Sequence, residues 1–118
     1  MKLLISTGEV SGDLQGSLLI KALKTNAEKR KIELEIIALG GERMRKAGAK
    51  LISNTSSIGA IGFLEAIPYI LPTFYAQSKI DNYLSSSPTN AVVLIDYMGP
   101  NIRLVLKIKK KFPNIPII

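Results

Sequence analysis

Asp96 is the residue of this sequence whose type and position best suit acid–base chemistry. It directly follows the apolar run Ala91–Ile95 and opens a short loop. A carboxylate at the end of a buried strand is costly unless it is paired or faces a cleft. We therefore expect Asp96 to face a cleft, where it is a candidate general base for an alcohol. The alternative is that Asp96 caps the next helix, although Asn101 would serve equally well as that cap.

The second candidate is the loop Gly8–Asp13, which follows the first apolar run. Glycines at this place are typical of nucleotide sites, but neither the dinucleotide fingerprint nor a Walker A motif is present. Glu9 and Asp13 would repel a phosphate, so the loop suits sugar hydroxyls better. The structural alternative is that Gly8 and Gly12 only allow the turn while Asp13 caps the helix behind it.

Composition narrows the chemistry further. The 118 residues suit one domain, and they include no His and no Cys. This excludes Ser-His-Asp catalysis and thiolate or imidazole metal sites, and it leaves carboxylates as the only general bases near neutral pH. The formal net charge of +7 favours an anionic partner such as a phospholipid surface or a phosphorylated substrate. Nucleic acid is disfavoured because no recognition motif is present. The densest basic cluster comprises Lys107, Lys109, Lys110 and Lys111.

Hydrophobic periodicity predicts alternating strands and helices. The expected strands are Lys2–Thr7, Leu34–Leu39, Lys50–Ser53, Ala91–Ile95 and the start of another at Ile115–Ile118. The expected helices are Leu14–Lys24, with Asp13 as N-cap, Glu42–Ala47, much of Phe63–Leu84 and Asn101–Lys111. This pattern predicts an α/β fold, a Rossmann-like doubly wound parallel sheet. Ligands of such sheets bind beyond the carboxyl ends of the strands, where Gly8–Asp13, Gly40-Gly41 and Asp96 would meet.

The segment Ile58–Ala76 is apolar and carries one charge, Glu65. Its length approaches the roughly 20 residues that span a bilayer, but the acid and two prolines argue against spanning. We expect a membrane-surface contact instead, with an ordinary buried helix as the alternative. The apolar run at the start of the sequence is too short for a signal peptide, which favours a cytoplasmic protein. The expected contact residues are Phe63, Ile67, Ile70, Leu71 and Phe74.

Four stretches, in order along the chain, resemble the lipid-A-disaccharide synthases. Gly8–Asp13 is similar to the family's G-E-x-S-G-D, and Gly40-Gly41 with Met44 to its G-G-x-x-M. The other two are Gly62–Glu65, similar to M-G-[FI]-x-E-[VA], and Ile95-Asp96-Tyr97 with Asn101 and Arg103. After Asp96 the family usually has Asp-x-Pro-x-Phe-Asn, where this chain carries Met98 and Pro100 instead.

The resemblance implies an inverting, metal-independent transferase of two Rossmann-like domains, the GT-B arrangement, without a cofactor. Such an enzyme transfers an acylated glucosamine from a UDP donor to the 6-hydroxyl of an acylated glucosamine 1-phosphate, at the cytoplasmic face of the inner membrane. The chain would be the N-terminal, acceptor-side domain, truncated at Ile118, without the donor-binding domain and inactive alone. The alternative is a stand-alone membrane-surface or lipid-binding domain without catalysis.

The resemblance also assigns residues. Asp96 matches the candidate general base, and Glu9, Ser11, Gly12 and Asp13 match the acceptor-side loop. Glu65 matches the acid beside the membrane-proximal helix. The full expected substrate-binding set is Gly8, Glu9, Ser11, Gly12, Asp13, Gly40, Gly41, Glu65 and Asn101.

Overall fold

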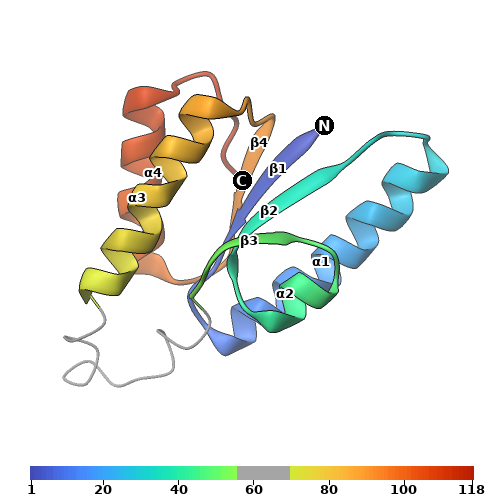
Figure 1. Cartoon of the computed structure of the whole chain (residues 1–118), viewed down its shortest axis with the longest axis horizontal. Coiled ribbons are helices and arrows are strands. Elements are labelled where there is room, and N and C mark those ends of the chain that lie inside the picture. The colour runs from blue at the N-terminus through green and yellow to red at the C-terminus, as the bar shows by residue number, and fades with distance from the viewer. Residues whose placement is uncertain (56–69) are drawn as a thin grey trace.

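A parallel four-stranded sheet forms the centre of the chain. In the computed structural model, which describes residues 1–55 and 70–118, the strand order is β3-β2-β1-β4. All neighbouring strands run parallel, so their carboxyl ends lie at one edge of the sheet (Figure 1). The strands are β1 (Lys2–Ser6), β2 (Glu35–Gly40), β3 (Lys50–Asn54) and β4 (Ala91–Leu94).

Helices cover both faces of this sheet. α1 and α2 lie on one face, and α3 and α4 lie side by side on the other (Figure 1). The helices are α1 (Val10–Lys29), α2 (Glu42–Lys46), α3 (Ile70–Ser86) and α4 (Met98–Lys111). The expected Rossmann-like, doubly wound α/β fold is therefore confirmed.

Double coverage explains why the strands are apolar throughout. Leu4 and Ile37 pack toward α3 and α4, whereas the neighbouring Ile5 and Ile36 pack toward α1. All four side chains are at most 2% exposed. Because successive strand residues point to opposite faces, both sets must be apolar when both faces are covered.

The last residues of the chain continue the sheet beyond β4. The Val92 N–H donates to the Pro116 carbonyl oxygen (2.9 Å), and the Ile118 N–H donates back to the Val92 carbonyl oxygen (2.9 Å). Val92 and Ile117 form a parallel bridge. The expected strand start at residues 115–118 is thus confirmed, and the order corresponds to that of a Rossmann sheet.

Two helix starts differ from expectation. α1 begins at Val10 and not at Leu14, so Asp13 lies in its first turn and is not its N-cap. α4 begins at Met98, so Asn101 is not its N-cap either. Both first turns contain glycine, a poor helix former, which hid them in the sequence pattern.

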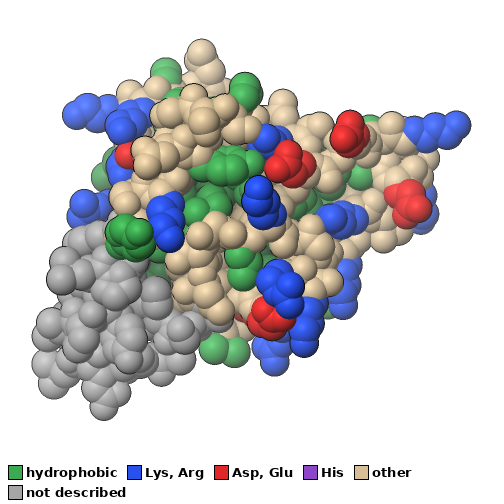
Figure 2. Space-filling view, viewed as in Figure 1, with side chains coloured by type: hydrophobic (Ala, Val, Ile, Leu, Met, Phe, Trp, Pro, Cys, Tyr) green, Lys and Arg blue, Asp and Glu red, His purple; other side chains and the backbone are tan. Residues whose placement is uncertain are grey.

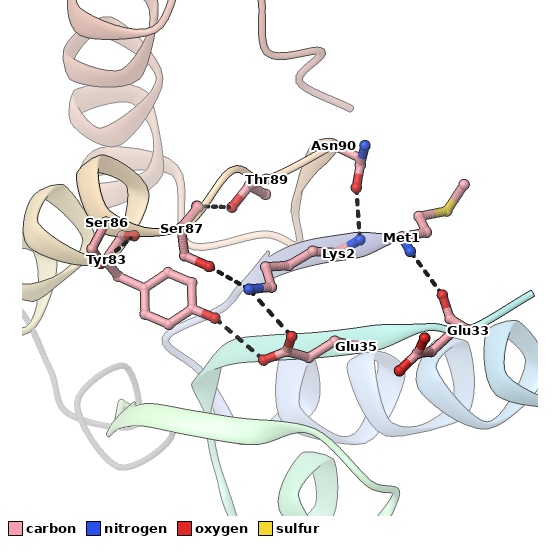
Figure 3. A network of polar contacts seen from close by, with 9 residues as sticks. All are labelled: Met1, Lys2, Glu33, Glu35, Tyr83, Ser86, Ser87, Thr89 and Asn90. Carbon is pink, nitrogen blue, oxygen red and sulfur yellow. Dashed lines mark hydrogen bonds and ion pairs between the residues drawn. The ribbon is translucent and has the colours of Figure 1, made fainter.

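A polar network fastens the amino ends of β1 and β2 to the end of α3, at the edge opposite the carboxyl ends (Figure 3). The Lys2 Nζ lies 3.2 Å from the Glu35 carboxylate and also donates to the Ser87 hydroxyl. The Tyr83 hydroxyl donates to Glu35 (3.4 Å). The hydrogen bond to Glu35 is the main reason that the pKa of Lys2 is raised. The polar side chains at the amino ends of β1 and β2 therefore serve to hold the sheet to α3.

Asp81 joins α3 to α4 through two lysines. Its carboxylate lies 2.8 Å from the Lys107 Nζ and 2.9 Å from the Lys111 Nζ. Burial alone would raise the pKa of Asp81, but the two ammonium groups outweigh burial and lower it. Two members of the basic cluster at the end of α4 therefore have a structural partner.

Of the five expected membrane-contact residues, two lie outside the described part of the chain, and three, Ile70, Leu71 and Phe74, lie in α3. Phe63 and Ile67, and with them Glu65, lie outside the described residues, whereas Ile70 and Leu71 open α3. None of the helices in residues 1–55 and 70–118 combines the length and apolarity that crossing a bilayer requires.

Asp81→Asn should weaken the packing of α3 on α4. We expect the free energy of unfolding at pH 7 to fall by about 0.5–1 kcal/mol, the range of a well-formed surface ion pair. Because the folded pKa lies below the unfolded one, this contribution is complete above about pH 4–5 and is lost as pH falls further. Urea unfolding at pH 7, 5 and 3 should therefore show a difference that narrows with acidity.

Glu28→Gln is the matched control, because Glu28 is exposed on α1 and its replacement changes the net charge equally. An equal loss of stability in that variant, or a loss in Asp81→Asn that persists undiminished at pH 3, would contradict the role of Asp81.

Candidate functional site

The loops that follow β1, β2 and β4 meet at the carboxyl edge of the sheet, as the sequence predicts. The Thr7 N–H donates to the Leu39 carbonyl oxygen (2.8 Å), which holds the end of β1 against the end of β2. The Ile95 N–H donates to the Ser6 carbonyl oxygen (2.8 Å), which does the same for β4 and β1. The residues of all three candidate loops are therefore brought to one rim.

Asp96 is exposed at this rim, at the point where the chain turns from β4 into α4. Asp96 and Tyr97 both have left-handed backbones, with φ of 50° and 58°. Such conformations cost about 1–3 kcal/mol each in non-glycine residues and need support from their surroundings. The Asp96 carboxylate accepts the Tyr97 N–H (3.1 Å), and Asp96 is exposed to solvent.

Asn101 supplies part of that support. Its side chain is 5% exposed and lies beneath the turn. Its Nδ2 donates to the Asp96 carbonyl oxygen, and its Oδ1 accepts the Ser6 hydroxyl hydrogen (3.0 Å). The amide thus holds the backbone of Asp96 to the end of β1. Asn101 was expected among the substrate-binding residues, and the structure places it behind Asp96.

Tyr97 also supports the turn at Asp96, because its ring lies against the loop that follows β1. A Cβ atom on Gly8 would overlap the Tyr97 ring, so only glycine permits this approach. The contact joins the loop after β1 to the loop after β4. The Gly8 position thereby fixes where Asp96 stands relative to the acidic loop.

Asp13 is turned away from the rim, toward α2. It is 4% exposed, and its Oδ1 accepts the N–H groups of Gly41 (2.8 Å) and Met44 (3.1 Å). Its Oδ2 accepts the Arg43 N–H (3.1 Å). These are the first amides of α2, whose helix dipole favours an anion at this end. Asp13 therefore caps a helix, as the structural alternative held, but the helix is α2.

The G-G-x-x-M stretch is a packing motif in this structure. The Met44 side chain is fully buried, and its sulfur lies where a Cβ on Gly40 or on Gly16 would have to be. Gly41 uses its N–H for Asp13. Gly40 therefore allows Met44 to pack against the end of β2, and Gly41 ties the start of α2 to Asp13.

Glu9 and Ser11 are the members of the acidic loop that face outward. Ser11 is exposed and Glu9 is half-buried. The Ser11 hydroxyl donates a hydrogen bond to the Glu9 carboxylate (3.5 Å). Glu9 stands at the N-cap position of α1 without a side-chain capping hydrogen bond. Both side chains are free to meet a ligand above the rim.

Thr7 and Thr55 belong to the site but carry no sequence signal. The Thr55 hydroxyl donates to the Thr7 carbonyl oxygen, and both residues are at most 2% exposed. Thr7 ends an apolar run and Thr55 follows a weak strand, so only the pairing of β1, β2 and β3 reveals their proximity. Among the described residues, no group of three His, Cys, Asp or Glu side chains is placed to hold a metal ion.

Known proteins resemble this chain closely. The family model described as lipid-A-disaccharide synthetase matches residues 3–118. Relatives named lipid-A-disaccharide synthase are 57% identical in Prochlorococcus marinus and 49% identical in Synechocystis, each over 118 residues and the whole of this chain. A Coxiella burnetii relative of that name is 33% identical over 91% of the chain. The chain spans only 30% of the length of the first two.

Among solved structures, the C-terminal domain of a Pyrococcus furiosus hydrogenase resembles the fold. Its TM-score is 0.62 at 16% sequence identity, with 99% of this chain and 88% of that domain covered. At this identity the likeness shows a shared α/β architecture alone.

Gly8→Ala should push the Tyr97 ring out of its place. We expect a loss of about 1–3 kcal/mol in the free energy of unfolding, as for an overpacked core position. In a Tyr97→Gly background the ring is gone, so the same substitution should cost much less. Urea unfolding of the four proteins of this double-mutant cycle gives the coupling free energy.

Gly99→Ala is the control, since a Cβ at Gly99 meets nothing within 4 Å. It should leave stability unchanged or raise it slightly, because alanine favours helix. If Gly8→Ala lowers the free energy of unfolding equally with and without the Tyr97 ring, the position of the ring does not depend on Gly8.

Proposed function

The chain belongs to the lipid-A-disaccharide synthetase family, and from this premise we propose that it forms the acceptor-side part of a glycosyltransferase of lipid A biosynthesis. The observation that carries the proposal is the exposed carboxylate of Asp96. It stands on a strained turn, supported by Asn101 and Tyr97, at the rim where the loop of Glu9 and Ser11 also lies.

The proposed reaction joins UDP-2,3-diacylglucosamine to 2,3-diacylglucosamine 1-phosphate. Asp96 accepts the proton of the acceptor's 6-hydroxyl while that oxygen forms a bond to the anomeric carbon of the donor. The bond from that carbon to the UDP oxygen breaks, and the products are lipid A disaccharide and UDP. A positioned general base contributes about 10²- to 10⁴-fold to such a step.

The residues divide into two groups by their contacts. Asp96, Glu9 and Ser11 present polar atoms at the surface and are proposed to meet the acceptor. Gly8, Gly12, Gly40 and Gly41 allow the backbone and side-chain packing of the rim, and Asp13 and Asn101 hold its loops. The proposed role of Glu65 concerns a residue outside the described part of the chain.

The donor is proposed to bind mainly to a domain outside these 118 residues. The relatives are more than three times as long as this chain, which spans 30% of their length. Because the chain alone would bind the acceptor but not the UDP-sugar donor, it should form no disaccharide.

A hybrid enzyme tests the role of Asp96. This chain would replace the 118 matched residues of the Prochlorococcus marinus relative, to which it is 57% identical. We expect the hybrid to form lipid A disaccharide, and Asp96→Asn in the hybrid to lower kcat by about 10²- to 10⁴-fold with little change in either KM. Product is measured with a radiolabelled acceptor.

Asp81→Asn in the same hybrid is the control, since Asp81 lies between α3 and α4 and outside the proposed site. Full activity of the Asp96→Asn hybrid would exclude Asp96 as the base. Disaccharide formed by the 118-residue chain alone would disprove the location of the donor site.

The second part of the proposal is a peripheral position on the cytoplasmic face of the inner membrane. The net charge is +7, and Lys and Arg side chains lie over much of the visible face (Figure 2). Cationic surfaces of this kind are attracted to anionic headgroups, by about 1 kcal/mol per residue close to the surface.

Vesicle sedimentation tests this position. The chain should pellet with vesicles containing phosphatidylglycerol and remain in solution with purely zwitterionic ones. Binding should weaken as salt is raised, because exposed charges are screened. If the chain binds neither vesicle at low salt, the proposed membrane position is wrong for these 118 residues. Vesicle binding without activity in the hybrid would favour a lipid-binding domain over an enzyme.

A further inference from the structure

The amino end of α1 offers backbone donors that the described residues do not use. The first hydrogen bond involving this turn runs from the Asp13 N–H to the Glu9 carbonyl oxygen (2.9 Å). The amides of Val10, Ser11 and Gly12 precede it, and Glu9 provides no side-chain cap. Uncapped amides at the start of a helix attract anions, the more so because the helix dipole is positive at this end.

A buried hydroxyl lies beneath the same turn. Thr7 is 1% exposed, and its Oγ1 has no hydrogen-bond partner among the described residues. This atom points at the first turn of α1, because a Cβ on Gly12 would overlap it. Buried polar atoms are nearly always paired, so an unpaired hydroxyl at the start of a helix is a candidate hydrogen-bond partner for a ligand.

The acidic side chains of the loop Gly8–Asp13 repel an anion at this helix end less than the sequence suggests. Of the two acids in the loop, Asp13 is directed to α2, where three amide N–H groups stabilise its carboxylate. Only Glu9 remains near the amino end of α1, and its half-buried side chain lies beside Ser11. The loop therefore presents one carboxylate, three free amides and two hydroxyls.

We propose that the first turn of α1 binds a phosphate monoester, through the amides of Val10, Ser11 and Gly12 and the hydroxyl of Thr7. Because Gly12 has no side chain, the Thr7 hydroxyl lies directly against the first turn of α1. As the source we take the 1-phosphate of the sugar acceptor, a choice that rests on the proposed function. Its 6-hydroxyl would then extend toward Asp96, since Tyr97 brings the two loops together at Gly8.

Amide NMR of the 118-residue chain tests the site directly. Three probes are titrated separately, namely glucosamine 1-phosphate, inorganic phosphate and glucosamine. Both phosphates should shift the amide resonances of Val10, Ser11 and Gly12, and glucosamine should not. Glucosamine 1-phosphate should bind more tightly than inorganic phosphate if the sugar also contacts the rim. Equal affinities would identify a general phosphate site and overturn the sugar source.

Two variants separate the contributions. Glu9→Gln removes the repulsive charge at the N-cap position of α1 and should tighten phosphate binding by about three- to tenfold at low salt. Thr7→Val keeps the side-chain shape but removes the donor, and should weaken binding by about tenfold. Glu28→Gln, at the other end of α1, is the charge-matched control and should leave the affinity unchanged. If Thr7→Val does not fold, the effect of Glu9→Gln still decides the site.

The outcomes separate this inference from the proposed function. Unshifted amides at Val10–Gly12 in the folded chain with phosphate, or equal shifts with glucosamine, would overturn the phosphate site and leave the role of Asp96 standing. Phosphate binding at α1 together with full activity of the Asp96→Asn hybrid would retain the site and reject the assignment of the base.

Discussion

The carboxylate of Asp13 is the interaction on which the arrangement of the rim depends. It belongs to α1, but it accepts three amide hydrogens from the start of α2, so one side chain joins the loop after β1 to the loop after β2. A buried charge is stable only when it is fully paired, and here backbone donors provide the pairing. The same contact directs the carboxylate of Asp13 toward α2, so Asp13 does not cap the amino end of α1.

Close approaches at glycines complete the arrangement. Gly8 admits the Tyr97 ring, Gly12 admits the Thr7 hydroxyl, and Gly40 admits the Met44 sulfur. The contact at Gly8 joins two loops that are distant along the chain, whereas the other two each pack a helix against the end of the strand just before it. The loops are therefore held by packing and by buried hydrogen bonds such as that of Asn101, and Asp96 can keep its left-handed backbone. Glycines after a first strand are typical of nucleotide sites, but here they serve largely to allow close packing of neighbouring side chains.

The order of strands and helices was predictable because doubly covered strands must be apolar on both faces, and the apolar runs are clear. The meeting of three loops at one rim follows from parallel pairing alone. The partners of individual side chains were not predictable. Asp13 and Asn101 each looked like the N-cap of the helix they lie in, because capping is read locally. Asp13 instead accepts the N–H of Gly41, 28 residues away. Asn101 binds the nearby carbonyl oxygen of Asp96 and also the hydroxyl of Ser6, which lies 95 residues before it. Thr7 gave no signal, since a hydroxyl within an apolar run is read as part of the strand.

The central position of β1 has a consequence for how the chain folds. β1 pairs with β2 through a nearby segment, but its other neighbour is β4, so that Leu3 must find Ala91. Closing so long a loop is entropically slow compared with forming contacts between sequence neighbours. During synthesis the first 55 residues, which contain β1 to β3 with α1 and α2, can therefore assemble before β4 has left the ribosome. Until β4 arrives, one side of β1 remains an open strand edge, and Asp96 can take its place at the rim only once β4 has paired with β1.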